Sequence, residues 1–396
     1  MMRKEEYIDL TFKYSAKNYY PLPVVLSYGE GVYVYDVEGK RYLDMLSSYS
    51  ALNQGHRHPK IVEALKEQAD RLTLTSRAFH NDKFPLFCKL LCEITKKDKV
   101  LLMNTGAEAV ETAIKTARKW GYLKKKVKEN QAEIIVCENN FHGRTTTIIS
   151  FSTEEQYKFG FGPFTPGFKI IPYDDLESLE KNINENTVGF LVEPIQGEGG
   201  VNVPREGYLK KAKEICQKNN VLFILDEIQT GLGRTGKLFC YQYEDAEPDI
   251  LILGKALGGG VYPVSAICAN DNIMDVFTPG DHGSTFGGNP LACACGIASL
   301  KVILEENLAE NARIMGEYFI NRLKEIKSPI IKEIRGKGLL IGVELKEKAR
   351  PYCEKLLEKG ILAKDTRENV IRFAPPLIIK KEEIDWAIEK IKEVFQ

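Results

Sequence analysis

The sequence predicts an α/β protein whose mainly parallel sheet is followed by a smaller α+β domain. Through the middle of the chain, short apolar runs alternate with amphipathic helical segments. That alternation is typical of parallel strands joined by right-handed helical crossovers. The 396 residues exceed one ordinary hydrophobic core and are enough for two domains.

The first expected elements are a small β-meander and a helix. Apolar and polar residues alternate around the turns GEG and EGK within residues 24–45. This period of two predicts short antiparallel strands. A helix over residues 60–72 follows, because Ile61, Leu65 and Ala69 recur at helical spacing.

The middle of the chain predicts six strands and the helices that connect them. The expected strands are residues 100–104, 133–137, 169–173, 188–195, 221–227 and 249–254. The expected helices run from about Ala107 to Trp120, over 174–183 and over 207–220.

The last hundred residues predict a connector helix and a second domain. A helical run over 291–326, broken near Asn307, precedes a tail of alternating strands and helices. One apolar face of the last helix predicts its packing onto a core: Ile384, Ala387, Ile388, Ile391, Val394 and Phe395. We therefore divide the chain into a segment that packs with the small domain (1–48), a large α/β domain (49–290), and a connector with the small domain (291–396).

Composition excludes several classes of partner. The 55 basic and 55 acidic residues leave no net charge to attract nucleic acid or anionic lipid. KKKVK at 124–128 is best interpreted as a solvated helix end.

No run of 18 apolar residues predicts a membrane span, and MMRKEEYIDL does not resemble a targeting peptide. Nine scattered cysteines fit reduced thiols, so we expect a cytoplasmic protein.

Two charged residues end two neighbouring strands. Asp226 follows the run VLFIL, and Lys255 follows DILILG just before Gly258. Ligands of open α/β sheets bind at the carboxyl ends of the strands. A single loop lysine is usually only exposed, but a carboxylate beside an amine fits a cofactor that needs both. Pyridoxal phosphate bonds a lysine through its aldehyde and an aspartate through its ring nitrogen.

Four further segments carry groups that suit the same chemistry, although each is weak alone. The helix starting near Ala107 offers free amides to a phosphate, or is simply a capped helix. Phe141 could stack on a flat ring and Arg144 could hold a carboxylate, whereas His142 is more often structural. One of two glutamates, Glu193 or Glu198, could pair with a cation in the site. The hydroxyls of Ser284 and Thr285 could bind phosphate or belong to a turn.

Two other patterns are rejected. GLGRTG at 231–236 matches the dinucleotide-binding pattern, but no helical period follows it. Cys88 and Cys92, like His56 and His58, lack a third ligand at useful spacing, so no metal site is expected.

Taken together, the chain resembles the class III (ornithine-type) aminotransferases, which are fold type I pyridoxal-phosphate enzymes, from about Asn18 to its C-terminus. The resemblance lies in the joint order of NTGAEA, FHGRT, VEPIQGE, LDEIQTGLGRTG, GKALGGG and STFGGNPLA. Within the class, five segments are most similar to the ornithine aminotransferases: NYYPLP, SSYSALNQGHRHP, LTSRAF, GFGPFTPGF and IRFAPPL. The resemblance implies a large domain with a mainly parallel seven-stranded sheet, a smaller α+β domain and pyridoxal 5'-phosphate as cofactor.

The resemblance also implies a role for each cofactor residue. Lys255 would form the Schiff base and shuttle a proton, and Asp226 would keep the ring nitrogen protonated. Gln229 would bond the phenolic oxygen, while Phe141 and Ile228 would cover the ring faces. The phosphate would be bound by Gly106, Ala107, Ser284 and Thr285, with Thr285 supplied by the partner of a homodimer or larger assembly.

The substrate residues follow from the same resemblance. Arg372 would bind the α-carboxylate of glutamate or 2-oxoglutarate, and Glu198 would neutralise Arg372 when ornithine is bound. Arg144 would hold the distal carboxylate of either substrate. Tyr19 and Tyr49 would orient ornithine so that its δ-amine reaches the lysine. One departure is His142, which stands where some ornithine aminotransferases carry an aromatic residue, although histidine is common there in the wider class.

Three alternatives remain open at this point. The near one is another ω-amine aminotransferase, acting on acetylornithine or 4-aminobutyrate. The second is an aminomutase or racemase on the same fold, which would need no 2-oxo acid acceptor. The third is a protein that keeps the fold only for binding, against which the presence of Lys255 argues.

Overall fold

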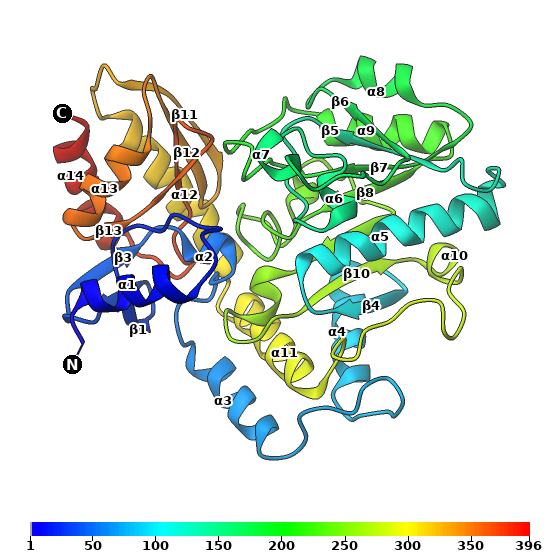
Figure 1. Cartoon of the computed structure of the whole chain (residues 1–396), viewed down its shortest axis with the longest axis horizontal. Coiled ribbons are helices and arrows are strands. Elements are labelled where there is room, and N and C mark those ends of the chain that lie inside the picture. The colour runs from blue at the N-terminus through cyan, green and yellow to red at the C-terminus, as the bar shows by residue number, and fades with distance from the viewer. Residues whose placement is uncertain (1) are drawn as a thin grey trace.

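A seven-stranded sheet forms the centre of the computed structural model, which describes residues 2–396 (Figure 1). Its strands lie in the order β4 (Lys99–Met103), β10 (Ser265–Ala269), β9 (Ile250–Leu253), β8 (Leu222–Asp226), β7 (Thr187–Val192), β5 (Glu133–Cys137) and β6 (Phe168–Ile171). The expected mainly parallel, seven-stranded sheet is therefore confirmed.

One strand of this sheet was not expected from the sequence. β10 runs antiparallel to both of its neighbours, β4 and β9, while the remaining pairs from β9 to β6 are parallel. Its sequence, SAICA, is short and contains one β-branched residue, so its propensity for a strand is weak. Burial of all five of its residues within the sheet stabilises it instead.

Helices cover both faces of the central sheet. Every residue of β7, β8 and β9 is buried, as expected for parallel strands that are packed on two sides. The longer helices of this part are α3 (Pro59–Ala69), α4 (Phe84–Thr95), α5 (Gly106–Trp120), α8 (Leu176–Asn182), α9 (Tyr208–Lys218) and α11 (Pro290–Glu305). Single turns lie at α6 (Thr146–Ile149), α7 (Glu155–Lys158), α10 (Asp271–Met274), η1 (Gly121–Lys125), η2 (Cys240–Tyr243) and η3 (Lys255–Gly258).

The N-terminal segment joins the C-terminal part of the chain in one sheet. β1 (Leu26–Glu30), β2 (Tyr33–Asp36) and β3 (Arg41–Asp44) form the expected antiparallel meander. β13 (Ile361–Leu362) pairs in parallel with β3. The two ends of the chain accordingly lie on the same side of the molecule (Figure 1). The domain boundaries at residues 48/49 and 290/291 stay a prediction.

The C-terminal part contains a second four-stranded sheet with helices on it. Its strands are β11 (Ile331–Lys337), β12 (Leu340–Leu345), β15 (Val370–Phe373) and β14 (Lys364–Thr366), and its helices are α12 (Leu308–Lys324), α13 (Arg350–Glu358) and α14 (Lys381–Phe395). The expected helix break is at Asn307, whose left-handed backbone (φ 50°) separates α11 from α12. In α14, the six apolar residues expected to face the core are the six that are buried.

Helix α1 (Lys4–Tyr14) was not expected from the sequence, and none of its residues is buried. No helix between residues 2 and 396 combines the length and apolar character needed to cross a membrane.

Parallel pairing brings the two charged strand ends together. Asp226 is the last residue of β8, and Lys255 lies two residues beyond the end of its neighbour β9. The loop after β5 and the start of α5 reach the same edge of the sheet, because the residues they carry line one cavity. The fold thus places the sequence motifs around a single point.

Candidate active site

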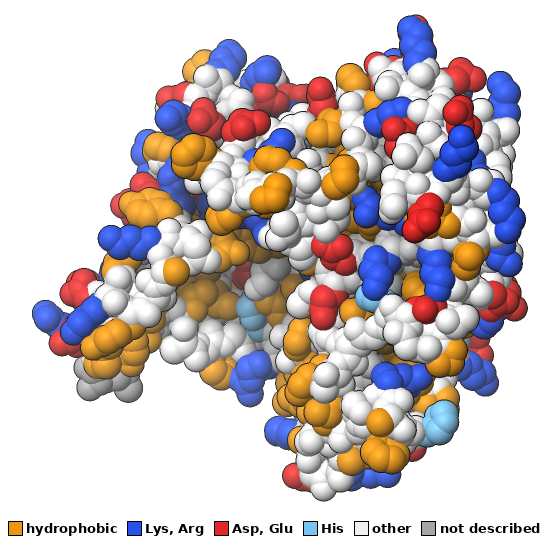
Figure 2. Space-filling model, turned by 45° about the vertical axis from the view of Figure 1, so that its right-hand side comes forward, with side chains coloured by type: hydrophobic (Ala, Val, Ile, Leu, Met, Phe, Trp, Pro, Cys, Tyr) orange, Lys and Arg blue, Asp and Glu red, His pale blue; other side chains and the backbone are white. Residues whose placement is uncertain are grey.

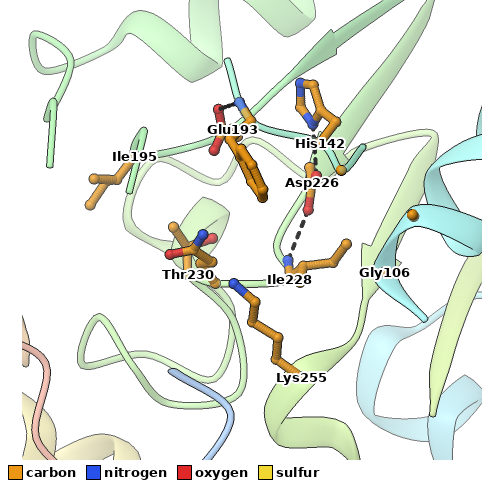
Figure 3. A pocket seen from close by; sticks show the side chains of 12 residues that line it. Gly106, His142, Glu193, Ile195, Asp226, Ile228, Thr230 and Lys255 are labelled. Atoms are coloured by element: carbon orange, nitrogen blue, oxygen red, sulfur yellow. Dashed lines mark hydrogen bonds and ion pairs between the residues drawn. The ribbon is translucent and has the colours of Figure 1, made fainter. Parts of the chain in front are cut away.

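A cavity of about 170 Å³ opens at the carboxyl edge of the central sheet (Figure 3). It is lined by Gly106, Ala107, Phe141, His142, Gly143, Glu193, Ile195, Asp226, Ile228, Gln229, Thr230 and Lys255. Seven of these residues were singled out from the sequence as cofactor-binding: Gly106, Ala107, Phe141, Asp226, Ile228, Gln229 and Lys255. Residues that are up to 149 positions apart in the chain, from Gly106 to Lys255, therefore share one small volume.

The carboxylate of Asp226 is held by two neighbours. Its Oδ2 lies 2.7 Å from Nδ1 of His142, and its Oδ1 accepts a hydrogen bond of 3.0 Å from the backbone N–H of Ile228 (Figure 3). The carboxylate is only 5% exposed. These contacts fix its orientation toward the cavity.

His142 is a site residue that sequence reasoning did not assign. The sequence favoured a structural role because a lone loop histidine usually has one. In the structure its side chain is fully buried against Asp226, and its Nε2 has no partner among residues 2–396. The available signal was its place next to Phe141, just after a strand that ends at the same edge.

Lys255 begins the turn η3 with a left-handed backbone (φ 46°). Such a conformation is rare for a residue with a side chain and occurs mostly where the surroundings fix it. Its amine points into the cavity (Figure 3). Burial lowers the pKa of this amine to about 8, although Glu198 and Asp226 oppose the shift. The neighbouring charge of Arg372 lowers it further.

The start of α5 presents unpaired backbone amides to the cavity. Thr105 caps the helix and accepts a bond of 3.2 Å from the N–H of Glu108, whose carboxylate in turn accepts from the N–H of Thr105 at 2.7 Å. The N–H groups of Gly106 and Ala107 have no partner within the helix, since they belong to its first turn. A Cβ at position 106 would come within 3.0 Å of Ile228. A larger residue there would therefore narrow the space in front of the free amides of α5.

Glu193, for which the sequence leaves two roles open, lies in the cavity wall. It accepts a hydrogen bond of 3.1 Å from the backbone N–H of Phe141, which secures the loop that carries the aromatic ring. Burial raises the pKa of Glu193 well above its usual value, and the nearby Asp226 carboxylate acts in the same direction. Glu198, by contrast, lies with the substrate residues.

A wider cavity of about 920 Å³ has Phe141 in common with the first one. Four of the five residues expected to bind substrate line it: Tyr19, Tyr49, Arg144 and Glu198. Basic and acidic side chains are interspersed over the face of the molecule seen in Figure 2, so no broad patch of one sign covers that face.

The fifth residue, Arg372 on β15, is 1% exposed and reaches the site from the small domain. Its Nη1 donates to Oε1 of Glu198 at 2.8 Å and to Oε1 of Gln229 at 3.2 Å. Burial alone would raise the pKa of Glu198, but the charges of Arg372 and Lys255 hold it below its usual value. The Nε and Nη2 donors of Arg372 are buried without a partner in the part of the chain that the structure describes. Burying a donor without a partner costs free energy. These two donors therefore indicate a binding site for a hydrogen-bond acceptor.

Tyr49 is held in the site by an unusual left-handed turn, α2 (Ser47–Ser50). All four of its residues have positive φ, from 48° to 71°. Each such residue costs about 1–2 kcal/mol, so the turn needs support. Asp44 provides it, because its Oδ1 accepts the N–H groups of Leu46 and Ser47 at 2.8 and 2.9 Å. The ring of Tyr49 lies 4.8 Å from the guanidinium of Arg372 and 6.0 Å from the amine of Lys255.

Of the nine residues expected to bind the cofactor, Ser284 and Thr285 do not line the smaller cavity of their own chain. Ser284 accepts a hydrogen bond of 2.9 Å from the amide of Asn104, next to the start of α5. Thr285 is exposed. No group of three or more potential metal ligands occurs among residues 2–396.

The donor set fits pyridoxal phosphate. A buried carboxylate, a buried amine, two free amides at a helix start and an aromatic face correspond to the ring nitrogen, aldehyde, phosphate and ring of that cofactor. The close packing beside the free amides also agrees with this cofactor. A Cβ at Gly143 would come within 2.9 Å of Ala107 and would disturb the start of α5.

Comparison with protein families and with curated proteins gives one consistent result. The model of the family described as "Aminotransferase class-III" matches residues 14–395. The chain is 62% identical over 395 residues to a protein named ornithine aminotransferase from Geobacillus sp. (strain WCH70), covering 100% of this chain and 99% of that protein. It is 60% identical over 396 residues to the ornithine aminotransferase of Bacillus subtilis (strain 168), with 100% and 99% covered.

Solved structures of aminotransferases have the same fold as this chain. The ornithine aminotransferase of Toxoplasma gondii, described with partial occupancy of pyridoxal phosphate at its active site, superposes with a TM-score of 0.98 at 49% identity, covering 99% of this chain and 94% of that one. The acetylornithine aminotransferase of Elizabethkingia anophelis superposes with a TM-score of 0.92 at 51% identity, covering 100% and 99%.

Proposed function

The chain belongs to the class III aminotransferases, and we propose that within this family it transfers the δ-amino group of L-ornithine to 2-oxoglutarate. The products are glutamate and glutamate 5-semialdehyde, which cyclises to pyrroline-5-carboxylate. The observation that carries this proposal is the buried guanidinium of Arg372, which is paired with Glu198 through Nη1 and keeps two further donors free. Such a pair suits a site that must accept a substrate with a carboxylate next to the reacting carbon and one without it.

Pyridoxal phosphate is the cofactor of this family, and when bound it supplies an electron sink next to the substrate carbon. We propose that Asp226, oriented by His142, holds the ring nitrogen in its protonated form. Phe141 and Ile228 would cover the ring faces, Gln229 would bond the phenolic oxygen, and the free amides at the start of α5 would bind the phosphate.

Lys255 is the proposed catalytic base. Its amine would hold the cofactor through the cofactor's aldehyde. The same amine would take a proton from the substrate carbon that bears the nitrogen and return one later in the reaction. Burial of the amine limits its contact with bulk water during this transfer.

Two arginines of different character explain how one site accepts two substrates. In our proposal, Arg144 receives the distal carboxylate of either substrate. Arg372 binds the α-carboxylate of glutamate or 2-oxoglutarate through its free Nε and Nη2. With ornithine in the site, Glu198 stays on Arg372 and spares the enzyme an unpaired buried charge.

Tyr19 and Tyr49 are proposed to orient the amino-acid head of ornithine. Replacement of Tyr49 by isoleucine should lower kcat/KM for ornithine about tenfold and allow 4-aminobutyrate to compete, because the aromatic ring and its hydroxyl disappear while the side chain at this position stays apolar. Measurement of kcat/KM for both donors checks this. An unchanged ornithine value would show that Tyr49 does not select the donor; Tyr20→Ile, which changes an exposed neighbour of Tyr19, is the matched control.

The proposal extends to assembly and location. Thr285 is exposed and does not line the cavity of its own chain, which supports its binding the phosphate of a partner subunit in a homodimer. Ser284 in the same loop would contribute there as well. The nine cysteines are free thiols, which supports a cytoplasmic location.

One assay separates the proposed function from its rivals. The protein is incubated with ornithine and 2-oxoglutarate, the semialdehyde is trapped with an aminobenzaldehyde reagent, and the incubation is repeated with acetylornithine and with 4-aminobutyrate as donors. Acetylornithine is the important comparison, because the Elizabethkingia protein of that name is 51% identical. Preference for it would replace the proposed donor. Turnover that needs no 2-oxo acid would indicate a mutase or racemase.

The lowered pKa of Lys255 predicts how the protein captures its cofactor. At pH 7 an amine with a pKa of about 8 is about one tenth free base, compared with fewer than about one in a thousand for an ordinary lysine. Because only the free base attacks the aldehyde, the capture rate of cofactor-free protein should rise with pH and level off above about 8. The rate is followed by visible absorbance between pH 6.5 and 9.5. Free N-acetyl-lysine is the control for titration of the cofactor itself, and a rate that levels off no earlier than this control would contradict the prediction.

A further inference from the structure

The guanidinium of Arg144 lies over an aromatic ring that has no assigned role. Its guanidinium carbon is 3.6 Å from the ring centroid of Tyr157, which is stacking distance, and 5.7 Å from the ring centroid of Phe141. The rings of Tyr157 and Phe141 meet edge to face at 6.1 Å. Tyr157 therefore links the guanidinium proposed to bind substrate with the ring proposed to cover the cofactor.

No carboxylate in residues 2–396 is within ion-pair distance of Arg144, and its side chain is exposed. A long side chain without a partner has many rotamers, and ordering it on substrate binding costs entropy. An aromatic face holds the plane of a guanidinium without using its N–H donors, which stay free for a carboxylate. Stacking thus orders Arg144 and leaves its charge available.

The segment that carries Tyr157 is itself fixed to the small domain. Tyr157 lies in the single turn α7, which is capped by Glu154, whose Oε1 accepts a hydrogen bond from the backbone N–H of Gln156. The other oxygen of Glu154 accepts a bond of 2.8 Å from Nη1 of Arg367, in the turn between β14 and β15. Arg144, Glu154, Tyr157 and Arg367 all line the wider cavity. The ion pair therefore holds the turn in place beside the route to the reacting groups.

We propose that Tyr157 is a positioning residue, whose ring keeps the guanidinium of Arg144 oriented for the distal carboxylate of the substrate. This rests on the proposed function, in which Arg144 binds that carboxylate. The ring acts through Arg144 and touches neither substrate nor cofactor. The aromatic face carries the effect, and the hydroxyl does not.

The experiment is a double-mutant cycle on the cofactor-loaded enzyme, with 2-oxoglutarate as the varied substrate. Tyr157→Leu and Tyr157→Gln should each raise KM for 2-oxoglutarate about fivefold and leave kcat within about twofold. Tyr157→Phe should match the wild type. The control is Phe159→Leu, which removes an aromatic ring that is 87% exposed and two residues away. In an Arg144→Met background, Tyr157→Leu should change KM by less than about twofold, because the group it positions is gone.

Three results would overturn the proposal: unchanged KM in both non-aromatic variants, a Phe variant as impaired as they are, or a full Tyr157→Leu effect in the Arg144→Met background. The visible absorption band of the enzyme is the second readout. Loss of the band together with kcat would indicate a structural role and would also overturn the proposal. The donor assay of the wild type tests the function separately, because the cycle varies the acceptor and can be run with any donor the enzyme uses.

Discussion

Lys255→Ala should reduce turnover by more than about 10⁴-fold and remove the visible absorption band of the protein. Two functions disappear at once: the amine that bonds the cofactor aldehyde and the base that moves the proton on the substrate carbon. No other lysine lines the first cavity, so within residues 2–396 there is no neighbour to replace it. The fold should remain, because the alanine removes a poorly solvated amine from the protein interior.

The measurement is a steady-state rate with a visible spectrum, together with a thermal unfolding curve. Lys211→Ala is the matched control, since Lys211 is an exposed lysine on α9. It should leave both rate and spectrum unchanged. If Lys255→Ala kept the band, the cofactor would be bonded elsewhere, and the assignment of the amine would be wrong.

Much of the fold could be predicted because local pattern and tertiary role agree. Six strands of the central sheet and the face of α14 follow from apolar periodicity, which the burial of their residues explains. β10 could not be predicted, since its composition is neutral and its paired residues in β4 and β9 are at least 162 and 13 positions away. Tertiary burial decides such a segment, and one sequence does not show it.

The same contrast holds for the site. Asp226 and Lys255 could be predicted because they end apolar strands, and parallel strands deliver their ends to one edge. His142 could not, since its role depends on a hydrogen bond to a residue 84 positions away. The left-handed turn that positions Tyr49 contains no glycine, the residue that usually indicates such a backbone in a sequence. Arg372 was assigned by resemblance alone, because nothing in VIRF distinguishes a binding arginine from an exposed one.

Arg372→Met should slow the glutamate half-reaction about 10³-fold and the ornithine half-reaction by less than about tenfold. Removal of a buried guanidinium that binds a carboxylate costs about 2–5 kcal/mol, which spans about 30- to several thousandfold. Glutamate loses the partner of its α-carboxylate. Ornithine does not, because its carboxylate is proposed to lie on Arg144. Single-turnover changes in visible absorbance, measured with each amino donor in turn, separate the two effects.

The residual loss with ornithine has a specific cause that can be removed. Without Arg372, Glu198 keeps only Gln229 and the charge of Lys255 to oppose burial, so its pKa rises toward the neutral form or its charge stays poorly compensated. Adding Glu198→Gln to Arg372→Met should therefore restore the ornithine half-reaction to within about twofold of wild type and leave glutamate impaired. Equal losses for both donors in the single variant would mean that Arg372 supports the site as a whole. Arg372 would then not exchange Glu198 for the α-carboxylate of glutamate when the enzyme changes from one substrate to the other.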